Sequence, residues 1–589
     1  MIIKDLKYFT TEYHRLLGYK LFVYIATTII PAFLDGIGIT MIVPLLNLVV
    51  NDNTYQSKGN NSDFAYRLLQ YFNIDITLNN ILLFILSIYV FKFIISFSNS
   101  TFRSYLISLV VKKTRFRMYS QLANLKFGVM QQKSTGFYTN LAGVQLSQYI
   151  SGFAYLALFF TALLTALSYL TFSFFVDFKF SLLASISGGL FSLVFILLNK
   201  KIKALSIKNT KNESQITSYF IETIQSFKYL KSTNGLKLFL NKLEGQIEQI
   251  RKQTFASESL RGFFMAISEP LIIMLICFFI YFQVSVLGSS LVGMLLSIFL
   301  FHRALTNIMV TQKDWQFLMN ISGGITTVSE QLKHTKQNEE TDGLIQLNDN
   351  INLIEFKNVS FAYNNHYAIN KVNLKIEGKS SVAFVGESGA GKTTLADLCT
   401  LLYTPTEGEI FINNTSATQL NLQSFRSKIG LVTQDVYLYD DTIANNIALW
   451  AEYDEKRLIE ACMQAHALAF IKQLPDGFNT QIGDRGLRLS GGQKQRLSLA
   501  RELYKKPSLL ILDEATSALD SESESFIKET LDSLKGNITI IMIAHRLSTI
   551  KEANQVVVLK NGSINDIGTF EELANRDNYF QKIIQYQQL

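Results

Sequence analysis

Six long apolar runs fill the first half of the chain, and their length limits its possible folds more than any other feature. A helix needs about 20 apolar residues to cross the hydrocarbon core of a bilayer. Within lipid, backbone N–H and C=O groups must be paired inside the protein, and a helix pairs them within one segment. Residues 1–332 are therefore predicted to form a domain with six membrane-spanning helices, at about residues 21–50, 81–111, 153–176, 181–198, 263–282 and 289–303. The last run is short, so it spans a bilayer only if its helix extends on either side.

Lysine and arginine residues predict the orientation of these helices. They are concentrated before the first run, between the second and third, and between the fourth and fifth, whereas segment 283–290 contains none. Cytoplasmic loops next to membrane helices carry an excess of Lys and Arg. Both termini are therefore expected in the cytoplasm. The basic residues between runs include Lys112, Lys113, Arg115, Arg117, Lys200, Lys201, Lys203 and Lys208.

Among the charged residues inside the apolar runs, Asp35, Lys92 and Glu269 are of most interest. Charged groups are costly inside a bilayer and usually face the protein interior or a polar path. They are candidates for contact with a transported substrate. The alternative is that they pair, cap a helix irregularity or extend to the membrane surface, and the sequence leaves both interpretations open.

The overall charge and the cysteines exclude other classes of protein. The net charge is +8, but no basic patch with interleaved aromatic residues is present, so no nucleic-acid partner is expected. Cys277, Cys399 and Cys462 form no spaced pair, which argues against both a disulfide framework and a metal site.

The second half of the chain contains a phosphate-binding pattern. A short apolar run, residues 381–385, leads into a glycine-rich loop and then into a helical pattern over residues 392–402. Glycines allow backbone N–H groups to curl around phosphate oxygens, and the helix N-terminus favours negative charge. In this pattern Lys392 reaches the β- and γ-phosphates and the Thr393 hydroxyl suits Mg²⁺. The predicted ATP-binding residues of this loop are Gly386, Glu387, Ser388, Gly389, Ala390, Gly391, Lys392, Thr393 and Thr394.

A second apolar run ends in two acids that complete this chemistry. Residues 509–512 read as a buried strand, and Asp513 and Glu514 follow it. Asp513 suits Mg²⁺, through water, and Glu514 is placed to orient and polarise the attacking water. The alternative, acids that cap an ordinary turn, is disfavoured by the phosphate-binding loop upstream. Residues 351–589 are predicted to form an α/β P-loop nucleotide-hydrolase domain, joined to the membrane domain by a polar linker over residues 333–350.

With a third segment, these motifs resemble the nucleotide-binding domain of an ATP-binding cassette (ABC) transporter. The third segment, Leu489, Ser490, Gly491, Gly492 and Gln493, is similar to the signature motif of that family. Over its whole length the chain resembles an exporter-type half-transporter. The resemblance implies the type IV exporter fold, with long cytoplasmic coupling loops between the membrane helices. It departs from the family at Asp484, where a Glu is more common in the X-loop.

The resemblance also implies roles for single residues. Glu514, His545 (the switch histidine) and Gln434 (the Q-loop) are expected to be catalytic, and Tyr363 is expected to stack on adenine. For Tyr363 the alternative is a plain strand aromatic. Thr393, Gln434 and Asp513 are expected to hold Mg²⁺, and Ser517 and Asp520 belong to the D-loop motif. ATP and Mg²⁺ are the implied cofactors.

The signature motif implies a partner. In the family it faces the γ-phosphate that the other subunit's P-loop holds, so each ATP is shared between two cassettes. Because the chain carries one complete set of motifs, a second copy of itself is the simplest partner, in a C2 homodimer. A related half-transporter is the alternative.

The resemblance implies ATP-driven export or flipping of an amphipathic substrate by alternating access, in a bacterial cytoplasmic membrane. The segment 35–39, with Pro44 after it, is similar to the first span of exporters that handle lipid-linked saccharides, which favours a lipid or lipid-linked glycan. A multidrug or peptide exporter is the alternative. A nucleotide-gated channel or regulator is less favoured, because Glu514 is present.

Overall fold

The fold is taken from a computed structural model, which describes residues 2–42, 44–45, 64–176, 178–285, 291–364, 366–513, 521–544 and 547–587. The chain divides into two compact units. The first contains Met1–Leu125 and Val129–Glu339, and the second contains Lys126–Gly128 and Glu340–Leu589.

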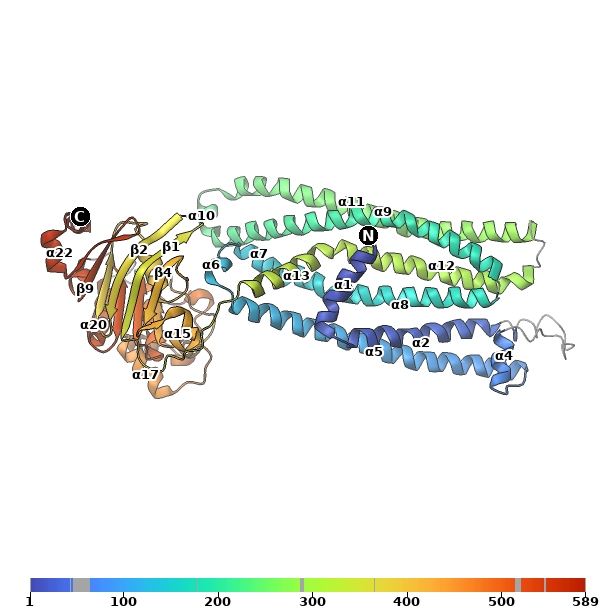
Figure 1. Cartoon of the computed structure of the whole chain (residues 1–589), viewed down its shortest axis with the longest axis horizontal. Helices are drawn as coiled ribbons and strands as arrows, with labels where there is room; N and C mark the ends of the chain where they lie inside the picture. Colours follow the sequence, from blue (N-terminus) through green and yellow to red (C-terminus); the bar gives the residue numbers. More distant parts are fainter. Residues whose placement is uncertain are drawn as a thin grey trace. The chain divides into compact units, whose positions relative to one another are not determined.

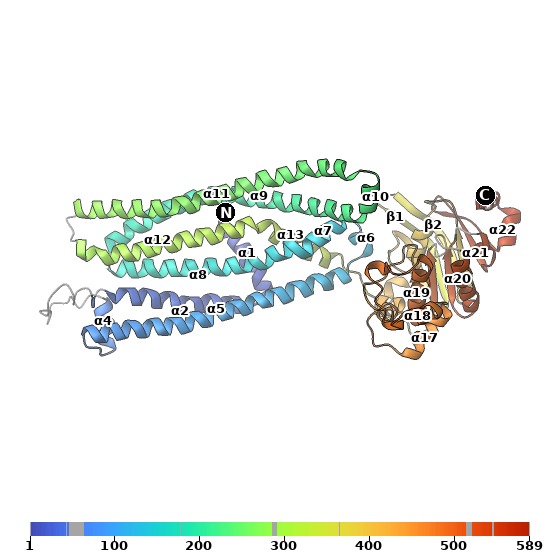
Figure 2. The same cartoon turned by 180° about the vertical axis from the view of Figure 1, so that it is seen from behind.

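The first unit is a bundle of long helices, which lie side by side in Figures 1 and 2. The apolar runs lie on six of them, and shorter helices join or extend these. The helices are α1 (Ile2–Leu17), α2 (Lys20–Thr40), α4 (Phe64–Tyr71), α5 (Leu78–Ala123), α7 (Thr135–Asn140), α8 (Leu146–Val176), α9 (Phe178–Gln225), α10 (Phe227–Ser232), α11 (Leu236–Ser285), α12 (Leu291–Asn320) and α13 (Ser322–Gln337). The short helix α6 (Phe127–Met130) is divided between the two units.

Four helical segments in the described part of the chain are long and apolar enough to cross a membrane. They are Lys20–Thr40, Leu78–Ala123, Thr135–Val176 and Leu236–Tyr281. The two other predicted spans, 181–198 and 289–303, fall on α9 and α12. The short sixth run is the beginning of a 30-residue helix, which continues to Asn320.

One predicted boundary differs from the structure, and another falls outside its described residues. α2 ends at Thr40, residues 42, 44 and 45 are again helical, and the predicted end of the first span at residue 50 lies among residues 46–63, outside the described part. The linker was expected to begin at residue 333, but α13 continues to Gln337. The polar sequence there is misleading because Leu332 and Thr335 are buried against the bundle, which keeps this segment helical.

Aromatic packing holds the centre of the bundle together. Trp315 of α12 is buried against Phe159 of α8, with ring centroids 5.2 Å apart. Tyr155 of α8 stacks on Phe317 of α12 at 4.9 Å. Such pairs contribute beyond the area they bury, so they fix α8 and α12 as neighbours.

The charged residues Asp35 and Lys92 contact each other. The Lys92 ammonium donates to one oxygen of the Asp35 carboxylate, and the Tyr169 hydroxyl donates to the other. These three residues come from α5, α2 and α8, so a polar cluster joins three helices. Both carboxylate oxygens of Asp35 are paired, which favours the structural interpretation of these charges.

The second unit contains two sheets. The four-stranded antiparallel sheet has the order β2-β1-β4-β5, and the six-stranded sheet has the order β10-β9-β3-β8-β7-β6. The strands are β1 (Leu353–Tyr363), β2 (His366–Glu377), β3 (Ser381–Val385), β4 (Glu407–Ile412), β5 (Thr415–Ser416), β6 (Ile429–Val432), β7 (Leu509–Asp513), β8 (Thr539–Ile543), β9 (Gln555–Lys560) and β10 (Ser563–Gly568). The helices are α14 (Lys392–Cys399), α15 (Leu422–Arg426), α16 (Ile443–Ala448), α17 (Glu455–Gln464), α18 (Leu468–Gln473), α19 (Gly491–Tyr504), α20 (Ser521–Leu534), α21 (Leu547–Lys551), α22 (Phe570–Arg576) and α23 (Asn578–Gln587).

The six-stranded sheet positions the candidate site. Its strands β3, β8, β7 and β6 are parallel neighbours, and Phe384 and Asp513 are both in register with Ile543. The carboxyl ends of these strands therefore meet at one edge. Ligands of open α/β sheets bind at this edge, and the segments that follow the four strands carry the predicted site residues.

Candidate functional site

The loop between β3 and α14 has the geometry of a phosphate cradle. Gly391 has φ +102°, and a Cβ atom there would lie 2.7 Å from the carbonyl oxygen of Ala368, so only glycine fits. The helix α14 begins at the next residue, Lys392, so its N-terminus points its free N–H groups at the loop. The predicted strand and the start of the predicted helix are confirmed, but α14 ends at Cys399, before the predicted end at residue 402.

The Lys392 side chain folds back over this loop. Its ammonium donates to the carbonyl oxygens of Gly386 at 2.9 Å and of Glu387 at 3.0 Å, and the residue is 7 % exposed. These contacts hold a positive charge above the backbone cradle. The combination of a fixed ammonium and a helix N-terminus suits a polyphosphate.

Tyr363 lies at the end of β1, close to the start of α14. Its hydroxyl is 3.4 Å from the Thr394 hydroxyl, and its ring meets the Tyr403 ring edge to face at 5.5 Å. The side chain is 40 % exposed. The structure thus brings an accessible aromatic ring to the helix that carries Lys392, where a flat base has room to stack.

Oxygen donors for a divalent cation gather at the same sheet edge. Thr393 lies in the first turn of α14, Asp513 ends β7, and Gln434 follows β6. The described residues contain no group of three or more His, Cys, Asp or Glu suited to a metal. Mg²⁺ needs no such cage, because it usually takes one or two protein ligands, with water and substrate phosphates as the rest. The hydroxyl, carboxylate and amide present here fit Mg²⁺.

Asp397 is a member of this site that the sequence analysis missed. Burial raises the pKa of its carboxyl to about 6, and the negative charge of Asp513 contributes to this shift. It lies four residues after Thr393 on α14 and therefore on the same helix face. That spacing was the available signal. Its effect is to concentrate negative charge at the edge where a cation fits.

The signature segment forms a helix N-terminus elsewhere in the second unit. Ser490 caps α19: its hydroxyl accepts a hydrogen bond from the Gln493 backbone N–H at 3.3 Å, and its own N–H donates to Gln493 Oε1 at 2.9 Å. This capping box fixes the first turn. Ser490 and Gly491 are exposed, so this turn presents an anion-binding end to the surface.

Four predicted site residues lie outside the described part of the chain. They are Glu514, Ser517, Asp520 and His545. Two of them directly follow described anchors, since Asp513 ends β7 and Ala544 follows β8.

Comparisons with known proteins agree on one family. The family model described as ABC transporter matches residues 369–517, and the model described as ABC transporter transmembrane region matches residues 21–309. The heterocyst differentiation ATP-binding protein HepA of Nostoc sp. is 32 % identical over 481 residues, which are 80 % of this chain and 78 % of the relative. The ATP-dependent lipid A-core flippase of Francisella tularensis is 31 % identical over 515 residues, 83 % of this chain and 82 % of the relative.

The fold has a solved counterpart. The structure of a bacterial Atm1-family ABC exporter with ATP bound is similar with a TM-score of 0.79, at 22 % sequence identity. The match covers 98 % of this chain and 99 % of that one. The predicted fold class, a membrane helical domain followed by a P-loop domain, is confirmed.

Proposed function

The chain belongs to the ABC transporter family, and we propose that it is a half-transporter that uses ATP to flip or export a lipid or lipid-linked glycan across a membrane. The observation that carries this proposal is the sheet edge that holds Lys392, Asp513 and Gln434, in a chain that also contains the helices of a membrane domain. Binding energy from ATP can shift a transporter between two membrane states only if ATP binds them differently.

Each residue of the site has a distinct role in this proposal. Lys392 and the N-terminus of α14 bind the β- and γ-phosphates, and Tyr363 stacks on the adenine. Glu514 orients and polarises the attacking water, while His545 contacts the γ-phosphate. Thr393, Asp513 and Gln434 would hold Mg²⁺, which supplies positive charge to the phosphates when it is bound.

The assembly in this proposal is a dimer in which each signature segment completes the partner's site. Ser490 supports this because it caps the N-terminus of α19 and is exposed, so this anion-binding end is accessible to a partner. A second copy of the chain is the simplest partner.

The membrane is proposed to be a bacterial cytoplasmic membrane, with both termini and the nucleotide domain in the cytoplasm. The distribution of Lys and Arg supports the orientation. The bacterial relatives support the location.

The cargo proposal has support from named relatives. Proteins of Francisella, Legionella and Photorhabdus called ATP-dependent lipid A-core flippase are similar to this chain. The identity with the Legionella protein reaches 46 % over 253 residues, 42 % of this chain. A saccharide-bearing lipid is therefore the favoured cargo.

The test is ATP turnover by the purified full chain in liposomes. Vanadate-sensitive phosphate release is expected, and both Lys392→Ala and Glu514→Gln should lower it by about a hundredfold or more. Asp476→Asn, at an exposed position, serves as the control and should leave turnover unchanged. If the chain were a nucleotide-gated channel or regulator, loss of ATP turnover in Glu514→Gln would have little effect on its function.

The cargo is tested in the same liposomes. Glycolipids are expected to stimulate turnover and to appear in the opposite leaflet. Stimulation by a peptide, with none by any lipid or glycolipid, would refute the cargo proposal while leaving the ATPase intact.

A further inference from the structure

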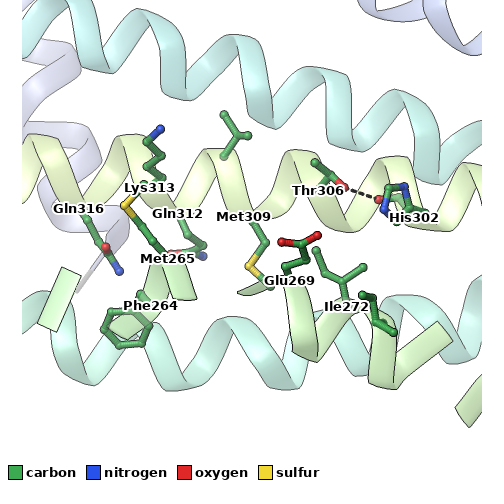
Figure 3. Close-up of a pocket in the computed structure, with 12 residues that line it drawn as sticks. Phe264, Met265, Glu269, Ile272, His302, Thr306, Met309, Gln312, Lys313 and Gln316 are labelled. Atoms are coloured by element: carbon green, nitrogen blue, oxygen red, sulfur yellow. Dashed lines mark hydrogen bonds between the residues drawn. The ribbon is translucent and has the colours of Figure 1, made fainter. Parts of the chain in front are cut away.

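A cavity of about 450 Å³ lies between α11 and α12 in the first unit. Much of its wall is apolar, formed by Phe264, Met265 and Ile272 of α11 and by Met309 of α12. Figure 3 shows this cavity from the side, with α12 above and the cut segments of α11 below. Polar side chains from both helices reach into the same space.

Two amides of α12 lack hydrogen-bond partners among the described residues. They are the Gln312 oxygen Oε1 and the Gln316 nitrogen Nε2, and both atoms are buried. The two residues are one turn apart, so they share a helix face, and Figure 3 shows both side chains directed from α12 toward α11. Gln316 is only 3 % exposed. A buried polar atom without a partner is costly, so this wall calls for a ligand that both donates and accepts hydrogen bonds.

Few charged side chains line the cavity. Glu269 rises from α11 toward α12 in Figure 3, and no ion pair among the described residues includes it. Lys313 also belongs to the lining, but Figure 3 shows its side chain leaving α12 on the side away from α11, opposite to Gln312 and Gln316. An anionic headgroup would therefore meet the Glu269 carboxylate without a cation facing it.

We propose that this cavity binds the uncharged, hydroxyl-rich headgroup of the amphipathic cargo, with Gln312, Gln316 and Glu269 as its hydrogen-bonding residues. The assignment rests on the proposed transport function and specifies which part of the cargo is recognised. Sugar hydroxyls both donate and accept, so they match an unpaired amide oxygen, an unpaired amide nitrogen and a carboxylate together. The apolar wall then takes the first carbons of the attached chain.

Three probes with the same octyl chain test the headgroup: octyl glucoside, octyltrimethylammonium and octyl phosphate. The chain has two tryptophans, so Trp450→Phe leaves Trp315, next to Gln316 in the sequence, as the single fluorophore. Each probe is titrated below its micelle concentration against the full chain in nanodiscs without ATP. Octyl glucoside is expected to bind most tightly, and Gln316→Leu should weaken it by about tenfold.

The matched control is Thr311→Val, on the same helix but outside the cavity. The Thr311 hydroxyl donates only to its own helix, to the Asn307 carbonyl at 2.8 Å, so binding should not change. Tightest binding of octyltrimethylammonium, abolished by Glu269→Gln, would overturn the proposal in favour of a cationic cargo. Tightest binding of octyl phosphate, or equal binding that no variant affects, would also overturn it.

Failure of this inference is distinct from failure of the proposed function. A Lys392→Ala chain, which the function makes inactive in hydrolysis, is still expected to bind octyl glucoside with unchanged affinity. Conversely, a chain that hydrolyses ATP normally but binds no probe in this cavity refutes the inference alone.

Discussion

At the scale of single residues, the ionised carboxylate of Asp397 lowers the free energy of unfolding, and this destabilisation can be measured through its dependence on pH. Burial and the charge of Asp513 raise the pKa of its carboxyl to about 6 in the folded chain, above the ordinary value of 3.8. Between these values the folded state binds more protons than the unfolded state, so stability falls as pH rises through this window. Above pH 6 the Asp397 carboxylate destabilises the folded state in full, and below pH 4 this destabilisation is absent.

Asp397→Asn is therefore expected to stabilise the cassette at pH 7.5. After allowance for solvent screening of this partly exposed group, the gain should be about 1 kcal/mol. Thermal unfolding of the nucleotide-free chain at pH 7.5 and pH 5 measures it, and the gain should shrink at pH 5. Asp476→Asn, at an exposed position, should show no such change. An equal gain at both pH values would contradict the explanation.

At the scale of elements, the cluster of Asp35, Lys92 and Tyr169 is expected to stabilise the packing of α2, α5 and α8 against one another. Removal of one member of a buried ion pair leaves an uncompensated charge, which costs more than removal of both charges. Lys92→Met should therefore lower the stability of the membrane domain by about 3 kcal/mol. The double change Asp35→Asn with Lys92→Met should recover most of this loss.

Thermal melting of the detergent-solubilised chain compares the three variants, with Asp35→Asn as the remaining corner of the cycle. If the double variant is no more stable than Lys92→Met alone, the two residues do not interact in the membrane.

The same cluster shows where sequence reasoning reaches its limit. Local patterns predicted the apolar helices and the strand and loop before Lys392, because each depends on residues a few positions apart. The partners of Asp35 are 57 and 134 residues away, and their contact depends on how three helices pack. The helical end of α13 was missed for the same reason, since Leu332 and Thr335 gain from burial that the polar sequence hides. Asp397 was missed because its shifted pKa arises from burial and from the charge of Asp513, which lies on β7, far from α14 in the sequence.

At the scale of the whole molecule, one cassette offers two half-sites. The P-loop at the sheet edge and the capped turn at Ser490 each provide an anion-binding helix N-terminus. If both half-sites of one chain bound the same ATP, a monomer would have a complete site. The proposed shared arrangement instead predicts that two differently damaged chains repair each other.

Lys392→Ala and Ser490→Arg chains, each with its own tag, test this sharing. Each chain alone should be inactive, because every dimer has two damaged sites.

A mixed dimer has one site with both defects and one with none, since the intact P-loop of one chain meets the intact signature of the other. With random pairing half the dimers are mixed, so co-expression should restore about a quarter of wild-type turnover if the two sites act independently. Mixed dimers, purified through both tags, should reach about half. The doubly purified dimers should unfold at the same temperature as the wild type. If their turnover nevertheless stays at zero, either each ATP is held within one chain or neither site works without the other. Mixed dimers of Lys392→Ala with wild type separate these outcomes, because one intact site suffices only if the sites act independently.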